Sequence, residues 1–426
     1  MKKTKIKNTG EYVYTEKLKN GLEVIMIPNN KVKNFYLTLN VKFGSIHTNF
    51  KFEGKNHKLP KGIAHFLEHL MFNMPDKTTA FEYYSKIGSN INAFTTYEYT
   101  SYEVYANSKF KENLSYLLKY VYTPYFTKEI VSGEKGIITE EIKMISDNPA
   151  SEIVYGMYRN VFVKDERKYL IAGTVDDIKS ITLDDIKLAY DAFYHPENMF
   201  LVITGNFDPT EAVAIATETL SNFEFPKYEK PVIKKYKEPA KVATEYFEKE
   251  MPVDMHKVTI ALKIPKSNFK VLELSNLELK MYLSLIIRIN FGNTSLLKEE
   301  LLSGSIISDS ISYHLTDTLD HFVIAILANT DYPDYFMQRI NEKLLDLSIS
   351  KEEIERKIKT SISNLILCFD EIKVVNSDIQ DDLVYEGKFI HDIYDYYQDI
   401  NIESASKVLE KLKNHEKSVT IIKPKE

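Results

Sequence analysis

The residues best suited to do chemistry in this sequence are His65, Glu68 and His69, within the run GIAHFLEHLMF. Positions four apart on an α-helix lie one above the other, so the two imidazoles can present nitrogens to one point. Glu68 precedes the second histidine on the neighbouring flank, within reach of a water held at that point. Two nitrogen ligands and a carboxylate base are what metal-assisted hydrolysis requires. The order His-x-x-Glu-His inverts the commoner zinc motif His-Glu-x-x-His.

A helix that carries two surface histidines by chance is the simpler interpretation of this motif. The remaining positions of the run are apolar, so we expect the helix to be buried: Ile63, Phe66, Leu67, Leu70, Met71 and Phe72. Polar side chains in a buried helix need partners. A metal ion would supply one, and the sequence therefore favours a metal site.

A third protein ligand must come from elsewhere, because catalytic zinc takes three and keeps its fourth position for water. The run YFTKEIVSGEKGIITEEIKMISDNP offers Glu134, Glu140 and Glu141. Glu134 and Glu141 are two helical turns apart and share a face, whereas Glu140 points about 100° away from Glu141. Acidic residues on a helix are mostly solvated, so the spacing alone leaves the choice open.

With these residues identified, the chain resembles the pitrilysin-type (M16) metallopeptidases, which are inverzincins, and in particular the short bacterial members built from one pair of domains. The resemblance covers nearly all of the N-terminal half, through LKNGLEVIMIPN, FGS, GIAHFLEHLMF, GSNINAFTTYEYTSYEVYA, AGTVDDIKSIT and YHPENMFLVITGNFD. It implies a Zn²⁺ ion held by His65, His69 and Glu141, with Glu134 as a supporting residue. It also implies peptide hydrolysis in which Glu68 takes the proton of a zinc-polarised water.

The resemblance further implies a substrate-binding strand over residues 90–95. Asn92, Ala93, Phe94 and Thr95 match a family stretch that pairs with the backbone of the bound peptide. An extended substrate added as a strand gains affinity from main-chain hydrogen bonds, with little reading of its sequence. An ordinary half-buried strand is an equally good interpretation for each of these residues taken singly.

The C-terminal half departs from the resembled family. Single-chain members carry an Arg a few residues before a Tyr, and both help to hold the substrate. In the matching run NTSLLKEELLSGSIISDSISYHL, Leu302 replaces the Arg and Ile307 or Ser308 replaces the Tyr, while Arg288 and Tyr313 are out of register. The chain is therefore similar to the zinc-bearing subunit of a heterodimer whose partner supplies Arg and Tyr, as in processing of bacteriocin-like or leader peptides. A self-sufficient homodimer is the competing hypothesis.

Two functions of other classes are weighed against the peptidase. Enzymes that cleave S-ribosylhomocysteine also use a His-x-x-Glu-His metal site, but their chains are far shorter. A non-catalytic, peptide-binding scaffold is the second, although family members of that kind usually lose the zinc motif, which is intact at residues 65–69. Metal-dependent peptide cleavage that Glu68→Gln removes would discriminate these functions.

Composition favours a soluble, intracellular enzyme. The net charge of −6 with both signs mixed argues against nucleic-acid binding. One cysteine, Cys368, cannot form an internal disulfide and suits a reducing compartment, so we expect a cytoplasmic location. The basic N-terminus lacks the apolar segment of a signal peptide, and no apolar stretch is long enough to span a membrane.

The chain of 426 residues, 44% of them hydrophobic, has room for two cores. Residues 35–43 alternate with period two, which predicts a half-buried strand of an antiparallel sheet. We expect helices over 62–74, 78–87, 109–121, 128–146 and 183–193, and a buried strand over 199–204.

A proline-rich, charged run at 222–241 is the best linker candidate. The predicted domains are thus an N-terminal zinc-binding domain over 1–221 and a C-terminal M16-like domain over 242–426. From the resemblance we expect two similar α+β domains, each an antiparallel-rich sheet with helices packed on it. No internal repeat is evident in the sequence itself.

Overall fold

Residues 1–425 are described by the computed structural model, and the chain divides into two compact units. The first unit comprises residues 1–142, 170–235 and 364–393, and the second comprises residues 143–169, 236–363 and the chain from 394 onward. Each unit therefore includes a short segment from the other half of the chain. The linker predicted at 222–241 stays a prediction. The two predicted domains were continuous in sequence and did not anticipate this exchange of segments.

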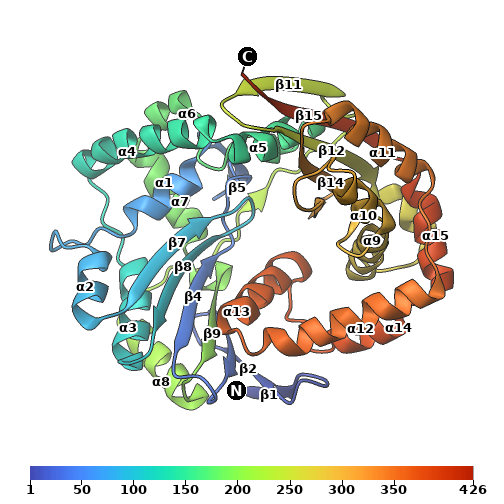
Figure 1. Cartoon of the computed structure of the whole chain (residues 1–426). Helices are drawn as coiled ribbons and strands as arrows, with labels where there is room; N and C mark the ends of the chain where they lie inside the picture. The colour runs from blue at the N-terminus through green and yellow to red at the C-terminus, as the bar shows by residue number, and fades with distance from the viewer. Residues whose placement is uncertain (426) are drawn as a thin grey trace. The chain divides into compact units, whose positions relative to one another are not determined.

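The first unit is built on a seven-stranded sheet, visible in Figure 1. In spatial order its strands are β1 (Lys2–Lys5), β2 (Tyr12–Lys17), β3 (Glu23–Pro28), β9 (Met199–Gly205), β4 (Phe35–Val41), β8 (Thr100–Ala106) and β7 (Asn90–Thr95). Only β3 and β9 pair in parallel; the other neighbours are antiparallel. Strand β7 lies at one edge of this sheet. A small separate sheet joins β10 (Val232–Ile233), β5 (Asn49–Phe52) and β6 (Lys55–Lys58).

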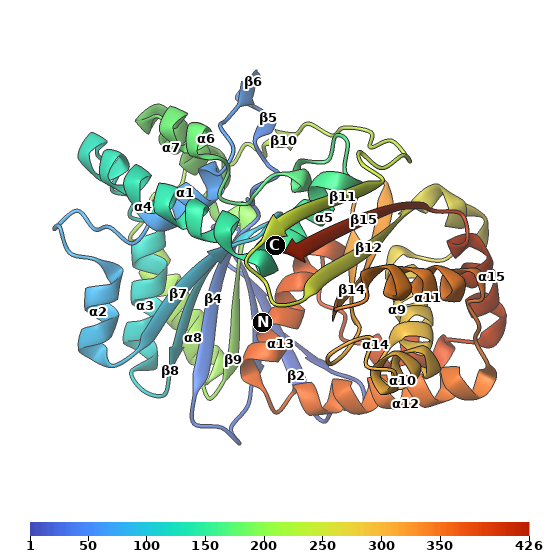
Figure 2. The same cartoon turned by 45° about the horizontal axis from the view of Figure 1, so that its top comes forward.

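Helices cover both faces of the seven-stranded sheet (Figures 1 and 2). They are α1 (Ile63–Leu70), α2 (Ala80–Ile87), α3 (Phe110–Val121), most of α4 (Lys128–Asp147), α6 (Val175–Ser180), α7 (Leu183–Phe193), α8 (Pro209–Leu220) and α13 (Ile372–Asp381). Alternate residues of β9 show the two faces. Leu201 and Ile203 pack in the main core, whereas Phe200 and Val202 pack in a second cluster with Ile379 of α13.

Helix α13 overturns one prediction about β4. The sequence predicts a half-buried strand, but all seven residues of β4 are buried, because α13 covers the face that was expected to meet solvent. The polar residues on that face are satisfied by hydrogen bonds instead. The Thr38 hydroxyl donates to Asn376 Oδ1 of α13 at 2.8 Å, and Asn40 Nδ2 donates to the Thr38 carbonyl at 3.1 Å.

The second unit is built on a five-stranded sheet with a core of its own. In spatial order its strands are β11 (Tyr246–Met251), β15 (Glu416–Pro424), β12 (His256–Pro265), β14 (His321–Thr330) and β13 (Ser312–Asp317). Its helices are α5 (Pro149–Val161), α9 (Asn276–Phe291), α10 (Leu296–Ser303), α11 (Pro333–Leu345), most of α12 (Lys351–Cys368), most of α14 (Ile393–Asp399) and α15 (Ile402–Leu412). Sheet and helices in both units confirm the α+β class.

The helices predicted from the sequence are all present, with boundaries within a few residues. The largest difference is at the end of α1, which stops at Leu70 rather than near residue 74. The side chain and backbone N–H of Asn73 both donate to the Leu70 carbonyl, closing a turn there. Within residues 1–425, no helix combines the length and the apolar character that crossing a membrane requires.

Candidate active site

Helix α1 carries the His-x-x-Glu-His motif, and Gly62 determines where it begins. Gly62 has φ of +80°, and a Cβ atom there would lie 2.2 Å from the carbonyl oxygen of Ala172. Only glycine fits this close approach with a left-handed backbone. The next turn buries Ile63, Phe66 and Leu67 in the core of the first unit. The motif is thereby fixed against the sheet with its polar side chains on the remaining face.

Helix α4 presents acidic side chains to that face. Its own buried side is formed by Val131, Ile138 and Ile142, while Glu134 and Glu141 point toward the histidines. Glu141 contacts both imidazoles: its Oε1 is 3.5 Å from Nε2 of His65 and its Oε2 is 3.5 Å from Nε2 of His69. The predicted trio therefore converges on one point.

The spacing of these donors suits a shared metal ion better than direct hydrogen bonds. A distance of 3.5 Å is long for a charge-assisted hydrogen bond. Ligands on one tetrahedral zinc, with bonds of about 2.0–2.1 Å, are about 3.3 Å apart. One donor atom from each of His65, His69 and Glu141 lies within 4.8 Å of the others. No other group of three His, Cys, Asp or Glu side chains in residues 1–425 meets this criterion. The donor set and its spacing fit Zn²⁺.

Glu134 supports His69 from behind. Its Oε1 lies 2.8 Å from Nδ1 of His69, so this nitrogen carries the proton and Nε2 is left as a ligand. Burial lowers the pKa of His69, but the hydrogen bond with Glu134 and the charges of Glu68, Glu134 and Glu141 outweigh it, and the pKa is raised overall. A metal must therefore displace a proton that three carboxylates help to hold.

Glu68 is buried beside the histidines, with 6% of its surface exposed. Burial raises the pKa of its carboxyl, although the charge of His65 and a hydrogen bond from Thr95 oppose this effect. The Thr95 hydroxyl donates to Glu68 Oε2 at 2.6 Å, and Thr100 lies 3.3 Å from Thr95 across the β7–β8 hairpin. The contact between Thr95 and Glu68 was not predicted. Nothing in the sequence indicates that a threonine at the end of a strand, 27 residues after Glu68, would contact that carboxylate.

The four residues predicted to bind substrate lie on the edge strand β7. Asn92 is exposed, Ala93 and Phe94 are half-buried, and Thr95 is buried with its hydroxyl directed at Glu68. β8 pairs with one side of β7, and no strand of the described chain pairs with the other. The backbone of β7 is therefore available along one edge, close to α1.

Other candidate residues lie apart from this cluster. Glu140 is exposed on α4, outside the donor trio, and His195 accepts a hydrogen bond from the backbone of Glu197 in its own turn. In the second unit, Leu302 is partly exposed on α10, and Ile307 after it is buried. Neither of these two side chains can donate a hydrogen bond, whereas Ser308, the alternative match to the Tyr, is exposed and carries a hydroxyl instead of a phenol.

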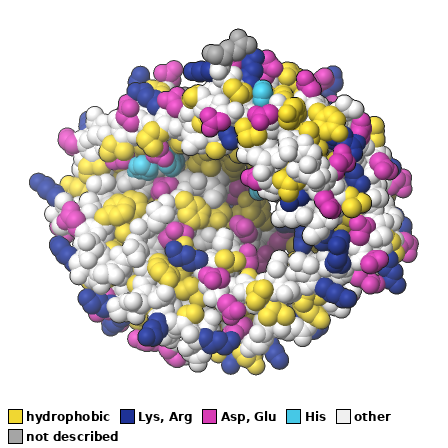
Figure 3. All heavy atoms as spheres, viewed as in Figure 1, with side chains coloured by type: hydrophobic (Ala, Val, Ile, Leu, Met, Phe, Trp, Pro, Cys, Tyr) yellow, Lys and Arg dark blue, Asp and Glu magenta, His cyan; other side chains and the backbone are white. Residues whose placement is uncertain are grey.

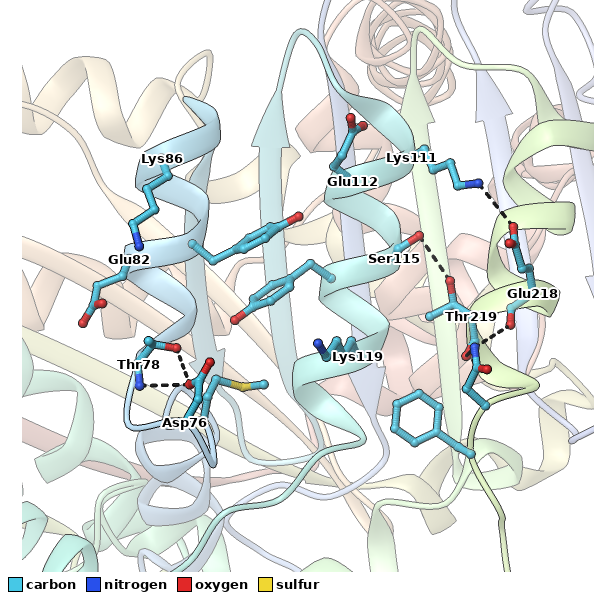
Figure 4. A pocket seen from close by; sticks show the side chains of 15 residues that line it. Asp76, Thr78, Glu82, Lys86, Lys111, Glu112, Ser115, Lys119, Glu218 and Thr219 are labelled. Atoms are coloured by element: carbon cyan, nitrogen blue, oxygen red, sulfur yellow. Dashed lines mark hydrogen bonds and ion pairs between the residues drawn. The ribbon is translucent and has the colours of Figure 1, made fainter.

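The surface of the cluster is open, and Figure 3 shows histidine atoms exposed beside acidic ones over the region of α1 and α4. A pocket of about 940 Å³ lies elsewhere, on the outer side of α2, α3 and α8 (Figure 4). Its lining includes a stacked pair, Tyr83 and Tyr116. Positively charged lysines and negatively charged Asp and Glu side chains are mixed around this pair. None of the motif residues lines this pocket.

Comparison with known proteins shows the family of the chain. The model for insulinase (peptidase family M16) matches residues 24–170, and the model for the peptidase M16 inactive domain matches residues 180–361. The chain is 32% identical over 409 residues to the uncharacterized zinc protease YmfH of Bacillus subtilis, covering 94% of each. This chain belongs to the M16 peptidase family. An uncharacterized zinc protease of Rickettsia bellii is 26% identical over 88% of each chain.

Solved structures agree with the M16 assignment and confirm the two-domain fold. A crystal structure described as an M16-like peptidase, from Alicyclobacillus acidocaldarius, superposes with a TM-score of 0.90 at 25% identity, covering 97% of this chain and 99% of that one. A protease from Helicobacter pylori shares the fold with a TM-score of 0.79 at 19% identity, covering 97% and 99%. The two sequence relatives of this M16 chain are named zinc proteases, and the two solved structures share its fold over nearly their whole length.

Proposed function

We propose that this chain is a zinc-dependent endopeptidase that hydrolyses short or unfolded peptides. The observation that carries the proposal is the convergence of His65, His69 and Glu141 on one point, with the buried carboxylate of Glu68 beside them. The zinc-protease names of its M16 relatives support it.

In this mechanism His65, His69 and Glu141 would hold the zinc ion. When bound, zinc supplies Lewis-acid chemistry, polarising a water and the peptide carbonyl. Glu68 accepts the proton of the attacking water and then donates it to the leaving amine. Its raised pKa suits this shuttle, because a carboxyl titrating nearer neutrality both takes and releases a proton readily. Glu134 keeps His69 in the tautomer that leaves Nε2 unprotonated.

Strand β7 would hold the substrate. An extended peptide can add along its unpaired edge as a further antiparallel strand, through backbone hydrogen bonds. The backbone of Asn92, Ala93, Phe94 and Thr95 would form these bonds, which places the peptide next to α1. This mode selects for an extended backbone, so unfolded peptides are preferred over folded proteins.

We further propose that the working enzyme is a heterodimer. Leu302 and either Ile307 or Ser308 match the positions at which the resemblance implies an Arg and a Tyr in single-chain members, so a second M16-like subunit would supply these two side chains. A homodimer with weaker substrate clamping is the alternative. Peptide maturation, of a bacteriocin-like or leader peptide, would suit such a divided enzyme. The single cysteine, Cys368, supports the predicted cytoplasmic setting.

The test is cleavage of a pool of unstructured peptides by the purified zinc-loaded chain, with the metal content assayed on the same sample. We expect the Glu68→Gln variant to keep its zinc, while any cleavage rate falls by a factor of about 10²–10⁴ or more. Activity retained in this variant would contradict the role of Glu68. Bound zinc without cleavage by the wild-type chain would direct the search to a partner subunit, and cleavage by the chain alone would contradict the heterodimer.

A further inference from the structure

Two cationic side chains of the second unit lie together without an acidic partner. Lys357 of α12 is buried, with 8% of its surface exposed, and its Nζ donates to the hydroxyl of Thr294 at 2.8 Å. Arg288 of α9 is half-buried, and its Nη1 donates to the hydroxyl of Ser361 at 2.7 Å. No ion pair joins either cation to a carboxylate within residues 1–425.

Lys357 belongs to α12, and Arg288 hydrogen-bonds to a residue of the same helix. Lys357 and Ser361 are four residues apart on α12 and therefore neighbours on one face of the helix. Arg288 hydrogen-bonds to Ser361, one helical turn from Lys357, and its charge acts on the Lys357 ammonium. Burial lowers the pKa of Lys357, and the charges of Arg288 and Arg356 lower it further, while the charge of Glu353 opposes them only in part. The two positive charges thus repel each other in a partly dry environment.

Buried cations elsewhere in this unit are paired. Lys263 is fully buried, and its Nζ lies 2.6 Å from Glu238 Oε1. Arg167 is also buried and lies 2.8 Å from Asp165. Buried charges ordinarily require such partners, since an uncompensated charge is costly to desolvate. Lys357 and Arg288 together are an exception, and a bound anion would resolve it.

We propose that Arg288 and Lys357 form a site for a carboxylate of the peptide substrate, flanked by the hydroxyls of Ser361 and Thr294. The planar guanidinium fork matches the two oxygens of a carboxylate, and an ammonium adds a second charge. A carboxylate is the anionic group that an unmodified peptide carries, either at its C-terminus or on Asp and Glu side chains. The inference rests on the proposed peptidase function for the choice of ligand.

The test measures peptide binding to the full-length, zinc-loaded Glu68→Gln protein, in which binding is separated from cleavage. Fluorescent peptides of one sequence are compared with a C-terminal carboxylate or amide, and with an internal Glu or Gln. In this background we add Arg288→Gln or Lys357→Met. The matched control is Arg339→Gln, which removes the same charge from an arginine already paired with Glu300.

We expect the site to bind either the C-terminal carboxylate or the internal Glu. The peptide in which that carboxylate is neutral should then bind the Glu68→Gln protein at least about tenfold more weakly than the charged peptide. The charged peptide should lose affinity by the same factor when Arg288→Gln or Lys357→Met is added. Lys357→Arg should restore the affinity, and the melting temperature shows whether each variant is folded. Equal affinity for charged and neutral peptides, absence of binding, or equal weakening by Arg339→Gln would overturn the proposal. Because cleavage is not measured, charge-dependent binding would persist even if the chain proved not to be a peptidase.

Discussion

Glu134 is the residue whose contribution to the metal site can be separated from ligation. It contacts His69 through Nδ1, the nitrogen opposite to the proposed ligand atom. We expect Glu134→Ala to weaken zinc affinity by about 10–100-fold, because the imidazole loses its orienting hydrogen bond. Competition with a chelator of known affinity measures this change. Glu129→Ala, at an exposed position of the same helix, is the control. Equal zinc affinity in the two variants would contradict a supporting role for Glu134.

The hydrogen bond from Thr95 predicts a pH effect. This donor favours the ionised form of Glu68, so its loss raises the pKa of the carboxyl further. A general base must be ionised to act, and the acidic limb of the kcat/KM profile should therefore move to higher pH. We expect Thr95→Val to shift it by about one pH unit, with zinc still bound.

Thr95→Ser is the matched control for that shift, since it retains the hydroxyl. Its pH profile should overlay that of the wild-type protein. If the valine variant also titrates at the wild-type pH, the hydroxyl does not influence the catalytic base.

At the scale of elements, the start of α1 is the most constrained point of the site. Gly62 combines a positive φ with a close approach to Ala172. We expect Gly62→Ala to destabilise the fold by at least about 3 kcal/mol, from the left-handed backbone and the overpacking together. Urea denaturation measures this free energy.

Gly10 separates the two causes, because its φ is +81° while a Cβ atom at this position would meet no other atom within 4 Å. Gly10→Ala should therefore cost only about 1 kcal/mol, the backbone contribution. Similar losses in both variants would show that the contact with the Ala172 segment is unimportant.

The helices and strands near the motif were predictable because their apolar residues repeat with the right period. Strand β4 shows the limit of that reasoning. Its alternation of Phe35, Leu37 and Leu39 with polar residues predicts one solvated face, yet the other face carries Thr38 bound to Asn376. That partner lies more than 300 residues away in the chain, and no local pattern can reveal it.

At the scale of the whole molecule, the metal is expected to add activity rather than fold. The two large cores consist of apolar side chains; α1 and α4 contribute such side chains to the first core, but none of the three metal donors is part of either core. We expect removal of zinc by a chelator to abolish cleavage and to leave the circular dichroism spectrum unchanged. The melting temperature should fall and recover on adding zinc, because a ligand of the native state stabilises it by mass action. Unfolding of the metal-free protein at room temperature would contradict this view.

The sequence by itself determined the chemistry of the candidate site. His65, Glu68 and His69 are neighbours on one helix, and helical periodicity is a local property that spacing reports directly. The choice of Glu141 over Glu140, by contrast, rested on family resemblance. The tertiary structure decided which carboxylate faces the imidazoles, which threonine contacts Glu68, and which segment covers each sheet. These contacts join residues distant in sequence, and they depend on how whole elements pack, which no local pattern encodes.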